Sequence, residues 1–123
     1  MKTFTVQEAD ALLPQIEALL DDLSQVRAQI VAEGAKLESI LKHAAGDGGS
    51  KAGSEYVLLL QHFNAALTAI QDFGCELKDL EQGLVDFPSY RGKELVYLCW
   101  KRGEDRIRFW HALDSGFAAR QPL

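Results

Sequence analysis

The spacing of apolar residues changes once along this chain, near Gly83, and that change limits the possible folds more than any other feature. Before Gly83, apolar residues recur at alternating steps of three and four, the spacing of helices that pack on one another. After it, short apolar runs alternate with turn residues, as in β-strands. The sequence therefore predicts an α+β protein in which long helices precede a small sheet.

Two stretches carry the helical spacing. The apolar positions of the first are Leu12, Ile16, Leu19, Leu23, Val26, Ile30, Leu37 and Ile40. Those of the second are Tyr56, Leu60, Phe63, Leu67, Ile70 and Leu77. We expect a long antiparallel helical hairpin with helices over residues 5–45 and 54–82, joined by a flexible glycine-rich connection over 46–53.

Local signals place the start of the first helix and suggest a break in it. Thr5 and Glu8 have the spacing of a capping box, in which each side chain accepts a hydrogen bond from the backbone N–H of the other. Pro14 lies too deep for a first-turn proline, so we expect a kink or break near Leu12 and Leu13. Gly83 is expected to end the second helix.

The last third predicts a three-stranded antiparallel meander over 84–112, followed by an irregular tail over 113–123, all within one domain of residues 1–123. The expected strands are Leu84–Phe87, ended by Pro88, then Lys93–Trp100 and Asp105–His111.

The tight turn before the third strand leaves the strand register open. A two-residue turn places His111 opposite Glu94, and a three-residue turn with a bulge shifts every pair by one. This register decides whether Cys99 shares a face of the sheet with His111, and either register fits the sequence.

Charge and cysteine usage narrow the class of protein. The chain has 123 residues and a formal net charge of −5, and its acidic residues concentrate before residue 84, so a nucleic-acid partner is not expected. No segment is apolar enough to span a membrane, and the first ten residues lack the apolar core of a secretory signal. Cys75 and Cys99 have no C-x-x-C spacing, so we expect two buried free thiols and a cytoplasmic location.

One histidine and two carboxylates in the strand region suggest a metal site. His111, Asp86 and Glu104 together form a ligand set suited to Zn, Mn or Fe, with Glu76 or Asp114 as further ligands. A small-molecule site built from the same residues is equally consistent. No H-x-x-H, H-E-x-x-H or E-x-x-H spacing makes the prediction specific.

Each candidate also has a purely structural interpretation. His111 fits a buried, hydrogen-bonded core position, and Cys99 between two apolar strand residues fits the core. Asp86 is unusual inside a strand and requires a partner, which could be an arginine such as Arg91, Arg106 or Arg108. Glu104 lies in a predicted turn where solvation is the ordinary state, and Glu76 lies on a predicted wet helix face.

Three C-terminal blocks resemble a known family. G-L-V-D-F-P, L-C-W-K-x-G-E and F-W-H-x-x-D-x-G-F-x-x-R-x-P, with the opening F-T-V-Q-E-A-D-A-L-L-P, are similar to the uncharacterised bacterial family named domain of unknown function 2203. The resemblance spans nearly the whole chain and implies a small prokaryotic protein of unassigned activity. It directs attention to Asp86, Cys99, Trp100, Glu104, His111, Asp114, Gly116, Phe117 and Arg120. The Ala118-Ala119 pair departs from the glycine-containing version expected before the arginine.

Two classes of function remain. A metal or small-molecule site, with or without catalysis, requires the polar residues of the sheet to converge in space. A helical interaction module, such as a homodimer formed through the helices, requires an exposed apolar stripe on the hairpin. Asp86 inside one strand and His111 at the end of another favour the first class.

Overall fold

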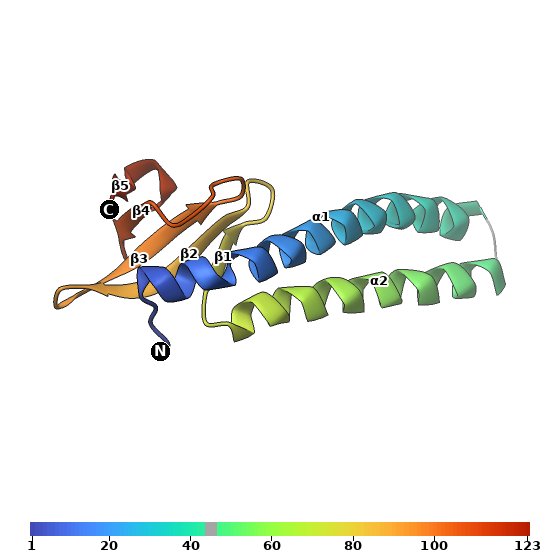
Figure 1. Cartoon of the computed structure of the whole chain (residues 1–123). Helices are drawn as coiled ribbons and strands as arrows, with labels where there is room; N and C mark the ends of the chain where they lie inside the picture. The colour runs from blue at the N-terminus through green and yellow to red at the C-terminus, as the bar shows by residue number, and fades with distance from the viewer. Residues whose placement is uncertain (44–46) are drawn as a thin grey trace.

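The computed structural model describes residues 1–43 and 47–123, and its two helices form a hairpin that extends away from a small sheet (Figure 1). The helices are α1 (Val6–His43) and α2 (Asp47–Asp72). The antiparallel strands lie in chain order: β1 (Glu76–Asp79), β2 (Leu84–Arg91), β3 (Glu94–Lys101), β4 (Phe109–Ala112) and β5 (Gln121–Pro122). A short 3-10 helix, η1 (Phe117–Ala119), precedes β5. The α+β class is confirmed, with five strands instead of the predicted three.

The first additional strand, β1, occupies residues that the apolar spacing assigned to the second helix. Helix α2 ends at Asp72 because Gly74 adopts a left-handed backbone conformation, with φ of 98°, that stops a helix. Glu76 and Leu77 then pair with Asp86 and Val85 of β2. Gly83, predicted to end the helix, instead lies in the turn between β1 and β2.

The second additional strand, β5, lies in the tail that was predicted to be irregular. Pro122 pairs with Phe109, and Gln121 pairs with Trp110. The backbone N–H of Leu123 donates a hydrogen bond to the carbonyl of Arg108 at 2.9 Å. The tail therefore closes one edge of the sheet.

Helix α1 continues through Pro14, so the predicted break does not occur. The proline is exposed, while its neighbour Leu13 and, one turn further, Ile16 are buried in the core. Pro14 cannot donate the backbone hydrogen bond of a helix interior, and packing of the buried side of α1 keeps the helix intact. The capping box is confirmed: Thr5 N lies 3.0 Å from Glu8 Oε1, and Glu8 N lies 3.1 Å from Thr5 Oγ1.

The helix ends nearest the tip of the hairpin also differ from the prediction. Helix α2 begins at Asp47, so residues 47–53 of the predicted flexible connection are helical. The predicted end of the first helix, at residues 44–45, lies outside the described residues, as does residue 46 of the connection.

Strand β2 runs past Pro88, where the sequence predicted its end. The β1 pairing reaches only as far as Asp86, so Pro88 lies on a free edge and no neighbouring strand requires its missing N–H. Its carbonyl accepts a hydrogen bond from Phe4 N at 2.8 Å, which connects the start of the chain to this edge. The pairing with β3 continues to Arg91 opposite Glu94.

Neither predicted register of the last hairpin is correct. Tyr97 pairs with His111, and Cys99 pairs with Phe109, because residues 102–108 form a longer connection than a tight turn. Ile107 leaves the strand path to enter the core, and its N–H donates to Asp10 Oδ1 at 2.7 Å. Directly paired residues share a face, so Tyr97 and His111 lie on the same face of the sheet. Cys99 lies two residues from Tyr97 along β3 and therefore shares that face with His111.

The hydrophobic core lies between one face of the sheet and the half of the hairpin nearest to it. The sheet contributes Val85, Phe87, Leu98 and Trp100, and α1 contributes Ala9, Leu13, Ile16, Leu20 and Leu23. Neither described helix contains a segment that is long and apolar enough to cross a membrane. Because side chains alternate along a strand, the residues between these core positions point to the opposite face of the sheet.

Candidate functional site

Three chemically reactive side chains meet on the sheet face that points away from the core. Asp86 of β2, Cys99 of β3 and His111 of β4 come from adjacent strands, and all three residues are buried. One potential ligand atom from each residue lies within 4.8 Å of those of the other two. The sequence predicted Asp86 and His111 as partners and named Cys99 as a further candidate, and the structure brings all three together. We call them the Asp–Cys–His cluster.

Hydrogen bonds fix the orientation of the imidazole of His111. Its Nδ1 lies 2.8 Å from the carbonyl oxygen of Ala112, and its Nε2 lies 3.0 Å from Oδ2 of Asp86. A carbonyl oxygen only accepts hydrogen bonds, so Nδ1 carries a proton. A second proton, between Nε2 and Oδ2, is shared by the imidazole and the carboxyl group.

Burial dominates the electrostatics of the cluster. It raises the pKa of Asp86, and His111 partly opposes that rise. Burial and the neighbouring Asp86 together raise the pKa of the Cys99 thiol to about 12, against the effect of nearby Arg120. The Cys99 thiol therefore stays protonated at neutral pH, and a cation could replace its proton together with the proton between Nε2 and Oδ2.

A small cavity of about 170 Å³ lies next to the cluster. Asp86 and Cys99 line it, together with Lys78, Leu84 and Tyr97 from the sheet. Residues of the tail complete its lining: Leu113, Ser115, Gly116 and Phe117. The tail thus provides a wall of the cavity beside the cluster, and the space is large enough for a few water molecules or a small ligand.

The side chains of Tyr97 and Lys78 are organised by Glu76. The hydroxyl of Tyr97 hydrogen-bonds to the Glu76 carboxylate, which raises the pKa of Tyr97 to about 12 and lowers that of Glu76. Lys78 Nζ lies 3.1 Å from Glu76 Oε1 and 4.9 Å from the centre of the Tyr97 ring. Glu76 is the strand partner of Asp86, so this candidate ligand lies beside the cluster with its carboxylate already engaged.

Glu104 lies outside the cluster and has a structural role. Its two carboxylate oxygens accept hydrogen bonds from the Arg120 guanidinium at 3.0 and 2.9 Å. Its Oε1 also accepts from Lys101 N at 2.7 Å, and its backbone carbonyl accepts from Trp100 Nε1 at 2.9 Å. Arg120 lies between two aromatic rings, 4.0 Å from the centre of Phe109 and 4.2 Å from that of Phe117. This Glu104–Arg120 pair attaches the tail to the sheet.

The remaining candidates are placed as follows. Asp114 is exposed and is not among the clustered ligands. Trp100 is fully buried in the core. Sequence reasoning missed Tyr97 and Lys78 as cavity residues. Tyr97 could have been found, because it lies two residues from Cys99 on the same predicted strand and so points to the same face. Lys78 could not, because its segment was predicted to be helical.

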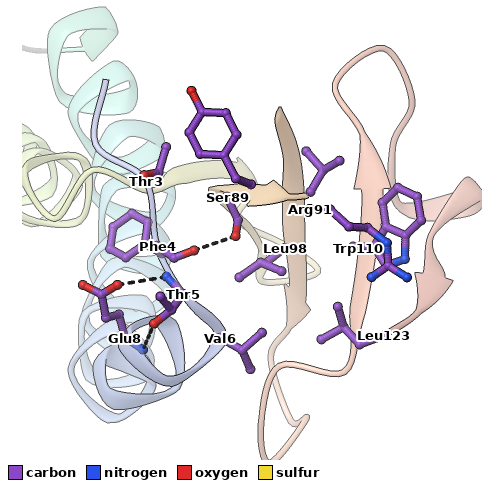
Figure 2. A pocket seen from close by; sticks show the side chains of 12 residues that line it. Thr3, Phe4, Thr5, Val6, Glu8, Ser89, Arg91, Leu98, Trp110 and Leu123 are labelled. Atoms are coloured by element: carbon purple, nitrogen blue, oxygen red, sulfur yellow. Dashed lines mark hydrogen bonds between the residues drawn. The ribbon is translucent and has the colours of Figure 1, made fainter. Parts of the chain in front are cut away.

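A second concavity, of about 400 Å³, lies on the core side of the sheet, between the start of α1 and the C-terminal end of the chain (Figure 2). Val6, Leu98 and Leu123 line its middle. The Ser89 hydroxyl donates to the Phe4 carbonyl at 2.6 Å, and the Arg91 guanidinium lies 4.6 Å from the centre of the Trp110 ring. Its polar side chains hold chain segments together, whereas the reactive side chains face the other side of the sheet.

These features define an α+β protein with a helical hairpin and a buried Asp–Cys–His cluster under its C-terminal tail. The sequence profile of the family described as uncharacterized conserved protein DUF2203 matches residues 2–123, so the chain belongs to that family. No curated protein and no solved structure matched the chain. Family membership confirms the resemblance of the C-terminal blocks and assigns no reaction.

Proposed function

We propose that Asp86, Cys99 and His111 bind one divalent metal ion, and that Zn²⁺ suits them best. In a tetrahedral zinc site with bonds of about 2.0–2.3 Å, the ligand atoms lie roughly 3.3–3.8 Å from one another. The three atoms here lie within 4.8 Å of one another, so side-chain movements of about 1 Å would bring them around a common centre. A thiolate favours Zn²⁺ over Mn²⁺, which prefers oxygen ligands. The convergence of three different ligand types in one buried place carries the proposal.

The charges of the cluster suit a divalent cation. A Cys99 thiolate and an Asp86 carboxylate together supply two negative charges, which neutralise the ion in a buried environment where unpaired charge is costly. The metal would replace the thiol proton and the proton shared between Asp86 and His111. Binding therefore releases about two protons and strengthens as the pH rises.

The hydrogen bonds around His111 support the same role. Imidazole ligands of metals ordinarily donate their other N–H to a carbonyl or carboxylate, which fixes the ring and directs the free nitrogen at the ion. The carbonyl of Ala112 holds Nδ1 of His111 in this way, and leaves Nε2 directed towards Asp86.

The cavity beside the cluster favours an open metal site. Three protein ligands leave a fourth position for water or a small ligand, the arrangement of catalytic zinc sites, whereas structural zinc sites are closed by four protein ligands. A zinc ion lowers the pKa of bound water to about 7, so hydrolysis of a small substrate is the reaction class that this arrangement favours. Tyr97 and Lys78 line the cavity and would contact that substrate.

Titration with Co²⁺ tests the proposal directly. In chelator-treated protein, Co²⁺ bound by a thiolate produces a near-ultraviolet charge-transfer band. We expect this band in the parent and its loss in Cys99→Ser. The matched control is Cys75→Ser, because Cys75 is also a buried free thiol with a raised pKa, of about 11, and lies outside the cluster. A parent without the band, or a folded Cys99→Ser variant that retains it, would overturn the proposal.

A further inference from the structure

The distal half of the helical hairpin is the second feature that the fold leaves unexplained. The buried residues of α1 end at Val26, although the helix continues to His43. From residue 27 onward, α1 contacts water or only α2, because the sheet lies at the opposite end of the hairpin (Figure 1). We use the name tip segment for residues 27–43 of α1 and 51–62 of α2.

The tip segment exposes apolar side chains in an unusual arrangement. The run Tyr56-Val57-Leu58-Leu59-Leu60 turns by about 100° per residue, so its apolar side chains surround α2 completely. Helix α1 covers only one side, which leaves Val57 49%, Leu58 63% and Leu60 42% exposed. On α1, Val31 and Leu41 are also more than 60% exposed. A helix that is apolar all round is ordinarily buried on all sides.

A groove beside Leu58 can receive a side chain from a partner. It has a volume of about 420 Å³ and lies between the two helices, lined by Gln29, Glu33, Glu55, Leu58, Leu59 and His62. An exposed leucine next to a groove on the same surface is the arrangement that a two-fold interface needs, because each copy then offers both the projecting side chain and its receptor.

The charge pattern along α1 favours a second copy of this chain as the partner. Residues 6–26 contain five acidic residues and no basic one, whereas residues 27–43 contain two acidic and three basic residues. Two tip segments can therefore meet without strong repulsion between like charges. A parallel arrangement would also bring the acidic halves together, whereas an antiparallel one keeps them apart.

We propose that the tip segments of two copies pack side by side and antiparallel, forming a four-helix bundle with a sheet at each end. Antiparallel packing of four helices around a shared apolar interior is a common and stable architecture. It covers part of the apolar run of α2 that α1 leaves exposed. This interface is independent of the metal site, because the cluster lies at the other end of the molecule.

Sedimentation velocity of the full chain over a wide concentration range tests this interface. We expect the parent to sediment as a dimer, and Leu58→Glu to raise the dimer dissociation constant by roughly tenfold or more, because it places a charge in an apolar contact. Thr68→Glu is the matched control: Thr68 is exposed on the same helix, nearer to the sheet, and the added charge there leaves the dimer unchanged.

Circular dichroism checks that each variant remains helical. We expect that it does, because Leu58 and Thr68 are both exposed. Val57→Glu is a second variant for the same surface and should weaken the dimer as well. A parent that stays monomeric at every concentration would overturn the proposal and leave another protein as the partner of this surface. A dimer that persists in both Leu58→Glu and Val57→Glu would also overturn it, because the interface would then lie elsewhere.

Discussion

His111 Nε2 lies 3.0 Å from Asp86 Oδ2, in a position where the two side chains are 2% and 4% exposed. The hydrogen bond joins β4 to β2 across β3, which lies between them in the sheet. One proton is shared by this pair, and the same position between the two atoms is where a metal ion would bind. Folding stability and metal affinity are therefore expected to depend on the same two side chains.

Removing one member of this pair should destabilise the metal-free protein strongly. Asp86→Ala leaves the Nε2 of His111 buried without a partner, so we expect the free energy of unfolding to fall by about 3 kcal/mol. Asp86→Asn should cost less, about 1 kcal/mol, because the amide can donate a hydrogen bond to neutral Nε2. Urea denaturation measures both values. Equal losses for the two variants would show that the hydrogen bond contributes little.

Alkaline pH should weaken the metal-free fold. The pKa of Cys99 is raised from 9.0 to about 12 and that of Tyr97 from 10.0 to about 12, so the folded protein keeps protons that the unfolded chain loses. The stability contributed by these groups is complete below about pH 9 and is lost as the pH rises towards 12. Urea midpoints between pH 8 and 11 should therefore decline. They should decline less steeply in Cys99→Ala, and an unchanged slope in that variant would contradict the role of the thiol.

The Glu104–Arg120 pair should hold the tail in place. Arg120→Lys keeps the charge but loses the two-pronged hydrogen bonding and the planar stacking between Phe109 and Phe117, so we expect a loss of about 1–2 kcal/mol. The tail should also become more susceptible to limited proteolysis. Arg108→Lys is the control, because its ion pair with Asp105 is largely exposed and should be worth less than about 1 kcal/mol. Equal effects of the two substitutions would show that the tail is held by other contacts.

Gly83 should be the least replaceable residue of the β1–β2 turn. Its φ is 69°, and a Cβ atom there would lie 2.5 Å from the Cβ of Arg102. Arg102 is itself held by an ion pair with Asp21 of α1. Gly92→Ala provides the comparison, because Gly92 has a similar φ of 65° and open space around it. The Gly92→Ala variant should therefore lose only about 1 kcal/mol of stability, from backbone strain alone. The melting temperature of Gly83→Ala should be clearly lower than that of Gly92→Ala. Equal melting temperatures would show that the turn can move away from Arg102.

The helical hairpin was predictable because its evidence is repeated along the sequence. The seam residues of α1 and α2 recur over many turns, and the Thr5–Glu8 capping box marks the start of α1. The continuation of α1 through Pro14 was not predictable, because it depends on which side of the helix the core covers.

The extra strands could not be predicted from spacing. Residues 76–79 are only four in number, and Leu77 extends the helical seam, so nothing local distinguishes a strand from one more helical turn. β5 consists of two residues that form a strand only because β4 offers a free edge. Both depend on tertiary pairing.

The candidate site was found in part. Asp86 and His111 stood out because polar residues are unusual inside strands, and the structure joins them. Cys99 remained a secondary candidate because the register of β3 and β4 was open, and that register depends on Ile107 turning into the core. Glu104 was grouped with the cluster because the sequence does not show that Arg120 occupies both of its oxygens.

Zinc stoichiometry tests the central claim most directly. Protein purified without chelator or affinity-tag metal is equilibrated with Zn²⁺, freed of excess and analysed for bound metal, alongside His111→Ala and Cys75→Ala with their folded state checked by circular dichroism. The account predicts about one zinc per chain in the parent and in Cys75→Ala, and a loss of bound zinc in His111→Ala. A parent that retains no zinc, or a folded His111→Ala variant that retains as much as the parent, would contradict it and leave the Asp–Cys–His cluster as a structural hydrogen-bond network.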